Sequence, residues 1–198
     1  MIKTDEQLVE LCRRDDLRAF RELLDRYRNK LMAFIYSMVG DYHLAQDIFQ
    51  ETFIRVYRHA DRFQDGCKFK PWLYAIAANQ CRDELRKLKR RSFLPLGDDG
   101  SFEKEGVKTV IPVDKRPGPR EIAKAREFKK ILEDELGELT PEHREVVIMS
   151  RVLGLKYDEI AQVLNIPSGT VRSRLHYSLE RLRERLKNKI FPEEKFSR

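Results

Sequence analysis

A segment rich in glycine, proline and charged residues, residues 92–119, divides this sequence into two blocks. It contains "PLGDDGSFEKEG" and "VDKRPGP", and no helical or strand period continues through it, which is typical of a flexible or extended linker. The blocks on either side carry apolar residues at the i, i+3, i+4 spacing of amphipathic helices and show no convincing strand pattern. The sequence therefore predicts an all-α protein with two helical domains, residues 1–91 and 120–198, joined by a linker.

The first block predicts four helices. Polar residues stand where the first two can be capped, Thr4 or Asp5 and then Asp15 or Asp16. The glycine in "VGD" supplies a stop after the second helix, and its aspartate can cap a third helix over about 43–60. A loop, "DRFQDGCKF", covers residues 61–69. A fourth helix is expected to start near Pro71, a residue favoured in first turns, and to end near Arg91.

Basic and aromatic residues gather in the fourth helix and the loop before it. "CRDELRKLKRR" holds six basic residues against two acids and directly follows the aromatic-rich "FKPWLYAIAAN". A basic groove beside aromatic platforms is the physical basis of single-stranded nucleic acid binding. Trp72 and Tyr74 are interpreted mainly as core residues. Phe63 and Phe69 lie in the predicted loop and are less easily explained as core.

The second block predicts a helix-turn-helix. Thr140 can cap a helix that Gly154 ends, a short helix covers 157–164, and the last helix begins at about Ser168 after a turn and Pro167. Its apolar stripe comprises Val171, Leu175, Leu179, Leu182 and Leu186, which leaves Arg172, Ser173, His176 and Tyr177 on the outer side. The second helix of such a motif enters the major groove of DNA, where arginine can read guanine.

The start of this last helix also suits a nucleic acid. Ser168 can cap it, and Gly169 removes side-chain bulk where the backbone could approach phosphates, which favour helix N-termini. A basic helix with a leucine stripe is equally typical of a solvated helix packed on a core, so periodicity alone leaves both interpretations open. The separate basic block in the fourth helix favours DNA binding.

Composition and charge limit the kinds of partner and the cellular compartment that we expect for this chain. The net charge of +7 fits a polyanionic partner but is weak support alone. No apolar run approaches the ~20 residues that span a bilayer, and acidic residues stand where a signal peptide would be apolar. We therefore expect a cytoplasmic protein without membrane insertion. Cys12, Cys67 and Cys81 form no CxxC pair, so neither a disulfide framework nor a zinc site is predicted.

Two other function classes compete with a nucleic-acid-binding initiation subunit. A helix-turn-helix repressor or activator with a sensory N-terminal domain would explain the second block but not the aromatic and basic residues at 69–91. An enzyme such as a nuclease is disfavoured, because the sequence has no carboxylate cluster at metal-ligand spacing, no glycine-rich phosphate loop and no nucleophile elbow. We predict no catalytic residue, no metal and no cofactor.

Three stretches together resemble a known family. "AQDIFQETFIRVYRHADRF", "FKPWLYAIAANQCRDELRKLKRR" and "LTPEHREVVIMSRVLGLKYDEIAQVLNIPSGTVRSRLHYSLERLRERL" are similar, in that order, to bacterial sigma factors of the extracytoplasmic-function (ECF) group of the sigma-70 family. The resemblance implies a region 2 domain (1–91), a linker (92–119) that passes near the polymerase active site and exit channel, and a region 4 domain (120–198). It implies a non-catalytic factor that binds core RNA polymerase and reads the −10 and −35 promoter elements, commonly restrained by an anti-sigma factor.

In region 2 the resemblance implies two surfaces. The third helix would bind the β′ clamp of core polymerase through Asp47, Gln50, Glu51, Ile54 and Arg55. The loop and the fourth helix would capture a base flipped from the non-template strand of the −10 element, and so melt the promoter. The implied DNA-binding residues are Phe63, Ile76 and Asn79 around the base, Phe69 beside them, and Lys68, Arg82 and Arg86 on phosphates. Cys67 lies in the same loop, where its oxidation could perturb the site.

In region 4 the resemblance implies contact with duplex −35 DNA and, through a hydrophobic groove, with the β flap of polymerase. The implied DNA-contacting residues are Lys156, Tyr157, Ser168, Gly169, Thr170, Arg172, Ser173, His176 and Tyr177. Two of them depart from the family pattern. Lys156 stands where a hydroxyl cap is frequent, which weakens capping, and Tyr177 stands where a basic residue is frequent, which places the usual −35 preference in doubt.

Overall fold

The computed structural model describes residues 3–92 and 119–190, and all regular structure in these ranges is helical. They form two compact units, the first containing α1–α4 and the second built mainly from α5–α8. The predicted all-α, two-domain fold is confirmed. The predicted linker lies almost entirely outside the described residues, as do residues 191–198 of the predicted second domain.

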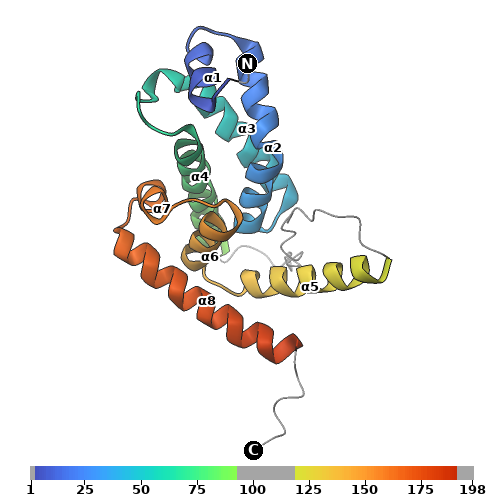
Figure 1. The fold of residues 1–198 in the computed structure, drawn as a ribbon. Coiled ribbons are helices and arrows are strands. Elements are labelled where there is room, and N and C mark those ends of the chain that lie inside the picture. The colour runs from blue at the N-terminus through green and yellow to red at the C-terminus, as the bar shows by residue number, and fades with distance from the viewer. Residues whose placement is uncertain (1–2, 93–118, 191–198) are drawn as a thin grey trace, which may run out of the picture. The chain divides into compact units, whose positions relative to one another are not determined.

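The first unit consists of α1 (Asp5–Cys12), α2 (Leu17–Val39), α3 (Tyr42–Arg58), a short 3-10 helix η1 (Ala60–Arg62) and α4 (Phe69–Ser92) (Figure 1). Short-range chemistry fixes where the first three begin. Thr4 and Gln7 form a capping box, and the carboxylates of Asp16 and Asp41 accept hydrogen bonds from the N–H groups that open α2 and α3. Gly40, with φ of 76°, ends α2 in the left-handed conformation that glycine adopts most readily.

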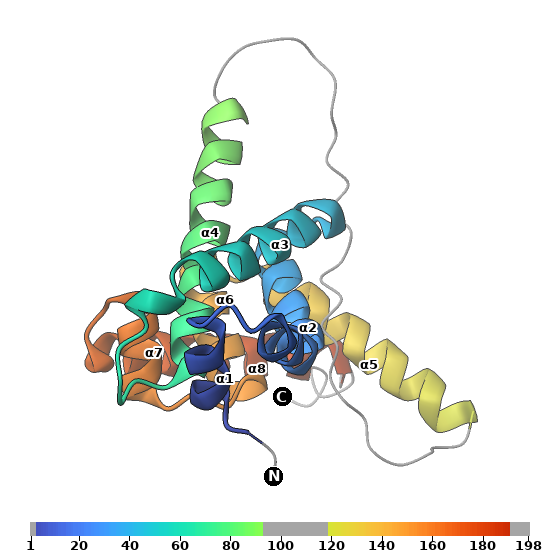
Figure 2. The same ribbon diagram turned by 90° about the horizontal axis from the view of Figure 1, so that it is seen from above.

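The core of the first unit lies where α2, α3 and α4 pack together. Figure 2 shows α3 crossing α4. Fully buried side chains come from all three helices, including Leu23, Leu31, Phe34, Ile35, Ala45, Phe53, Val56, Leu73 and Tyr74. The Tyr74 ring meets Phe34 edge-on with ring centroids 5.4 Å apart, which confirms that Tyr74 is a core residue. Each of the larger aromatic or aliphatic side chains contributes about 1.5–3 kcal/mol by leaving water.

The second unit consists of α5 (Pro119–Gly137), α6 (Pro141–Val147), a π-helical turn η2 (Ile148–Val152), α7 (Tyr157–Leu164) and α8 (Ser168–Ile190). A Schellman motif ends α7. Asn165 has φ of 53°, Ile166 N–H donates to Ala161 O at 3.1 Å, and Asn165 N–H donates to Gln162 O at 3.3 Å. Pro167 follows, so α7 and α8 form the predicted helix-turn-helix.

Packing and ion pairs hold α8 in the second unit. The predicted stripe is buried at Val171, Leu175 and Leu182. At the other end of α8, the buried carboxylate of Glu135 in α5 pairs with Arg185 and, at 2.6 Å, with Lys189. The guanidinium of Arg144 donates to the carbonyls of Leu136, Gly137 and Leu139 at 2.9, 2.6 and 3.1 Å, which secures the turn between α5 and α6.

Within residues 3–92 and 119–190, no helix combines the length and the apolar character that crossing a membrane requires.

Candidate nucleic-acid and protein interfaces

The loop before α4 differs from the sequence prediction. Phe63 and Phe69 are 5% and 0% exposed, so the expectation that these aromatic residues are not core is wrong. Their ring centroids lie 6.3 Å apart, and the Trp72 ring lies 5.3 Å from Phe63 and 6.0 Å from Phe69. For Phe69 the physical reason is that α4 begins at this residue, two residues before Pro71, and helical spacing places it on the same buried face as Leu73. A base could stack on the Phe69 ring only if the ring left the core.

Two side chains of the α1 segment fix the ends of this loop. The Arg13 guanidinium donates to Ala60 O at 2.9 Å and also to Phe63 O. The Glu6 carboxylate accepts the Phe69 N–H at 3.1 Å. Neither anchor was predicted, because no local pattern pairs residues about 50–60 positions apart. They attach both ends of the loop to the α1 segment, although Lys68 and Cys67 within the loop are exposed.

One face of α4 presents several of the predicted −10 residues. Asn79 is exposed, and its Oδ1 accepts a hydrogen bond from Arg82 Nη2 at 2.8 Å. Arg86 follows one turn later and pairs with Asp83 at 3.3 Å, and Ile76 is half-buried. Helical spacing of i, i+3 and i+7 therefore brings Asn79, Arg82 and Arg86 together. The amide and the two cations form a polar surface that can meet a base edge and phosphates.

The predicted polymerase-binding residues share one face of α3. Asp47, Gln50, Ile54 and Arg55 are exposed, and Glu51 is half-buried and pairs with Arg55 at 2.8 Å. Ile54 is 42% exposed, an apolar side chain among polar ones, as in many protein–protein contact surfaces.

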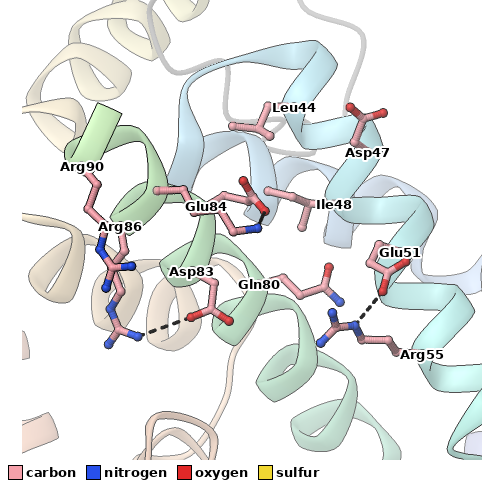
Figure 3. A pocket seen from close by; sticks show the side chains of 11 residues that line it. Leu44, Asp47, Ile48, Glu51, Arg55, Gln80, Asp83, Glu84, Arg86 and Arg90 are labelled. Carbon is pink, nitrogen blue, oxygen red and sulfur yellow. Dashed lines mark hydrogen bonds and ion pairs between the residues drawn. The ribbon is translucent and has the colours of Figure 1, made fainter. Parts of the chain in front are cut away.

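A groove of about 490 Å³ lies between α3 and α4 (Figure 3). Three ion pairs line it: Glu51 with Arg55, Asp83 with Arg86, and Glu84 with Lys87 at 2.7 Å. The remaining lining residues are Leu44, Asp47, Ile48, Gln80 and Arg90. Asp47, Glu51 and Arg55 were predicted at a protein interface and Arg86 at DNA. The other α4 residues of the opposite wall were not predicted, because only the packing of α3 on α4 brings the two walls together.

The outer face of α8 presents the residues predicted for −35 DNA. Arg172, Ser173, His176 and Tyr177 are exposed. Ser173 Oγ donates to Thr170 O at 3.1 Å, and His176 lies 3.9 Å from Glu180. The Tyr177 ring, 55% exposed, lies 5.3 Å from the ring of His143, whose Nδ1 is 2.9 Å from Thr140 Oγ1. His143 is half-buried beside this predicted DNA contact.

The N-termini of α7 and α8 also differ in detail from prediction. Ser168 is the first helical residue, so it does not cap α8; the Pro167 carbonyl accepts the first N–H groups, from Thr170 at 2.9 Å and Val171 at 3.2 Å. Ser168 and Gly169 are exposed and Thr170 is half-buried, and a Cβ on Gly169 would meet no heavy atom within 4 Å.

Lys156 lies directly before α7. Its backbone N–H donates to the Glu159 carboxylate at 2.9 Å, which is half of a capping box. Glu159 thus restores part of the capping that the absence of a hydroxyl residue removes. Lys156 itself is exposed, and Tyr157 is 39% exposed.

Comparison with known families gives two matches in order. Residues 23–91 match the model of sigma-70 region 2, and residues 129–182 match a model of sigma-70 region 4. These ranges contain α3, α4 and the helix-turn-helix. The residues of all three candidate surfaces therefore lie inside matched regions.

Similar proteins align over nearly the whole chain. The ECF RNA polymerase sigma factor SigW of Bacillus subtilis is 33% identical over 182 residues, which is 91% of this chain and 95% of the relative. The ECF RNA polymerase sigma-E factor of Escherichia coli K12 is 32% identical over 96% of this chain and 95% of its own length. RNA polymerase sigma factor CarQ of Myxococcus xanthus is 34% identical over 85% and 89%.

Solved structures support the fold. CnrH, in complex with the cytosolic domain of CnrY, matches with a TM-score of 0.67 at 22% identity over 93% of this chain and 98% of that chain. RpoE of Bartonella quintana, in complex with the anti-sigma factor NepR, matches with a TM-score of 0.65 at 23% identity over 85% and 96%. With two sigma-70 regions in order and relatives above 30% identity along almost its full length, the chain belongs to the ECF family of RNA polymerase sigma factors, which are non-catalytic transcription initiation factors.

Proposed function

We propose that this sigma factor binds core RNA polymerase in the cytoplasm and directs it to specific promoters. Region 2 (residues 1–91) reads the −10 element and region 4 (residues 120–198) reads the −35 element. The observation that carries the proposal is the division of α8 into two faces: Val171 and Leu175 are buried, whereas Arg172, Ser173, His176 and Tyr177 are exposed. A helix with this division can enter a major groove while its other side stays packed in the domain.

The −35 contacts follow from side-chain chemistry. Arg172 can donate two hydrogen bonds to a guanine edge, and Ser173 and His176 can reach bases or phosphates from the same side of α8. Lys156 and Tyr157, at the start of α7, and Ser168, Gly169 and Thr170, at the start of α8, would approach the phosphate backbone. Exposed N–H groups at these helix starts favour the negative charge of phosphates.

The −10 contacts centre on Asn79. Its exposed amide can donate to and accept from a base edge, and its bond to Arg82 is available for exchange with DNA. Lys68, Arg82 and Arg86 would hold phosphates, and half-buried Ile76 would provide apolar contact. Melting would proceed by capture of a flipped non-template base, which needs a few kcal/mol of binding energy to offset unstacking. We assign the buried rings of Phe63 and Phe69 to shaping this site from below, rather than to stacking on the base.

Polymerase would bind both domains. The α3 face of Asp47, Gln50, Glu51, Ile54 and Arg55 would meet the β′ clamp, and region 4 would meet the β flap through a hydrophobic groove. Attachment at two points fixes the separation of the two domains and raises the effective concentration of each at its promoter element. Free sigma factor should therefore bind promoter DNA weakly.

An anti-sigma factor is the other proposed partner. CnrH was solved with the cytosolic domain of CnrY, and RpoE with the anti-sigma factor NepR. A chain of the same fold and family offers comparable helical faces to such a protein. A soluble or membrane-anchored regulator that covers the polymerase-binding face would keep the factor inactive.

Reconstitution with bacterial core polymerase, followed by run-off transcription from a promoter library, tests the proposal. Selective initiation from promoters that share two spaced elements is expected. Tight binding to duplex DNA without any binding to polymerase would instead indicate a repressor or activator.

Single substitutions then test the two readers. Asn79→Ala should lower open-complex formation about tenfold, as measured by the permanganate reactivity of unpaired thymines. Arg172→Ala should weaken −35 recognition by a similar factor. Both magnitudes follow because each good base contact contributes ~1–3 kcal/mol. Asn188→Ala and Arg183→Ala, at exposed positions of α8 outside the proposed contacts, are the matched controls. Unchanged open-complex formation by Asn79→Ala would contradict the base-capture mechanism.

A further inference from the structure

Helix α4 presents neighbouring residues to two different environments. Asn79 is exposed on the face proposed for DNA, whereas Gln80 is only 6% exposed and lines the groove between α3 and α4. Successive residues of a helix point about 100° apart, so the next residues on the Gln80 side are Asp83, Glu84 and Lys87. All three also line the groove. One helix therefore has a DNA-facing side and a groove-facing side, and Arg86 lies where the two sides meet.

The amide nitrogen of Gln80 is buried without a hydrogen-bond partner among the described residues. Figure 3 shows its amide in the groove, between Asp83 on α4 and the Glu51–Arg55 pair on α3. A buried donor without a partner destabilises a folded chain. The charged groups around it are already engaged, since Asp83 pairs with Arg86 and Glu84 with Lys87. The groove thus holds a polar donor that no described residue satisfies.

The charge of the groove favours a protein occupant over DNA. Four carboxylates line it, from Asp47, Glu51, Asp83 and Glu84, against four cations, from Arg55, Arg86, Lys87 and Arg90. Phosphate groups would meet these acids, whereas a balanced lining suits a polar protein segment. One wall of the groove is formed by Asp47, Glu51 and Arg55, which are also proposed to bind polymerase, so the groove is continuous with that surface.

We propose that the groove extends the polymerase-binding surface from α3 onto α4, and that Gln80 donates its amide N–H to an oxygen acceptor on a segment of core polymerase seated there. The proposal rests on the proposed function. It adds the α4 wall of the groove to the polymerase-binding surface, and it makes Gln80 a residue that determines how a polymerase segment fits. An acceptor aligned with Gln80 Nε2 gains a buried hydrogen bond, and a misplaced segment leaves the donor unpaired. The unpaired donor lowers the affinity for a misplaced segment, and this difference in affinity gives specificity.

If Gln80 donates a hydrogen bond to polymerase, removing its amide should affect the stability of the free chain and its polymerase binding in opposite ways. Gln80→Met keeps the length and apolar stem of the side chain but removes the unpaired donor, so the free chain should be as stable as wild type or more stable. Polymerase binding should weaken, because the acceptor of the partner is left buried and unpaired. A residue that only supports the fold would behave differently, since its loss would lower stability and binding together.

The experiment measures the Kd of the full-length chain for bacterial core polymerase, by fluorescence anisotropy of an N-terminally labelled protein, and the Tm by far-UV circular dichroism. Gln80→Met is expected to raise the Kd about tenfold with no fall in Tm. Asp83→Ala, at an exposed position of the same wall, should also raise the Kd without lowering the Tm. Gln46→Met makes the same chemical change at an exposed α3 position outside the groove and should stay within about twofold of wild type.

Four outcomes separate the possibilities. The expected pattern supports the groove as a polymerase contact. An unchanged Kd for Gln80→Met and Asp83→Ala, with Glu51→Ala still impaired, would overturn the groove proposal and leave the proposed function intact. Parallel losses of Tm and affinity in both groove variants would also overturn it, by showing a structural role. Failure of the wild-type chain to bind polymerase would instead refute the proposed function.

Discussion

Replacing Phe69 with leucine tests whether the loop before α4 belongs to the core. The Phe69 ring is fully buried and lies near three other rings, at 5.4 Å from Tyr27, 6.3 Å from Phe63 and 6.0 Å from Trp72. Each aromatic pair contributes about 0.5–1.5 kcal/mol beyond its buried area. Leucine recovers part of the buried volume, so Phe69→Leu should lower the free energy of unfolding by about 2–4 kcal/mol.

The single tryptophan provides a fluorescence assay for unfolding of the first unit. Trp72 is the only tryptophan in the chain and lies within the affected cluster. Its fluorescence during urea unfolding therefore reports on the first unit, and far-UV circular dichroism follows the helices of both units. The urea midpoint of the fluorescence transition should fall while its slope stays unchanged, since the same surface is exposed on unfolding.

Phe128→Leu is the matched control. Phe128 is 48% exposed on α5, in the second unit, so the same chemical change there should alter the fluorescence midpoint by the equivalent of less than about 0.5 kcal/mol. The assignment of Phe69 to the core would be refuted if Phe69→Leu left the unfolding of the first unit unchanged yet abolished open-complex formation. That result would mean that the ring acts on DNA and is not a core residue.

Three further predictions concern single sites. In native protein a maleimide should modify exposed Cys67 much faster than Cys12, because burial, with a smaller contribution from Asp16, raises the pKa of the Cys12 thiol to about 11; equal rates by mass spectrometry would contradict this. Burial raises the pKa of Glu135, but hydrogen bonds from Lys189 and Arg185 outweigh it and hold the pKa below its ordinary value. The stability that these pairs contribute should be fully present above the unfolded-state pKa of Glu135 and be lost as pH falls through its lower folded-state pKa. Glu135→Gln should therefore reduce the loss of stability over this pH range in an acid titration followed by circular dichroism. The ring of His143 lies beside that of Tyr177 and is expected to position it on the DNA. His143→Ala should therefore weaken −35 duplex binding by the holoenzyme in the wild-type background but have little further effect in a Tyr177→Ala background. A double-mutant cycle measures this coupling.

The sequence alone determined where most helices of the described residues lie, because helix formation depends on neighbours within a few residues. Caps and stops such as Thr4, Asp16 and Gly40 act over one turn, and the stripe from Val171 to Leu182 repeats at helical spacing. The bounds of the short helix α7, residues 157–164, were predicted without error for the same reason. The family resemblance rests on the same local stretches, so it too depends only on the order of residues along the chain.

Only the tertiary structure decided which side chains leave water and which groups meet across helices. Phe63 and Phe69 have the sequence context of a loop, but a helix start two residues earlier and hydrogen bonds from Arg13 and to Glu6 turn both rings inward. Gln80 gives no local signal at all, and it becomes distinctive only because it lines the groove between α3 and α4 with an amide nitrogen that no residue in the described ranges pairs. Burial and unsatisfied hydrogen bonds depend on contacts between residues far apart in the chain, and no short-range pattern records those contacts.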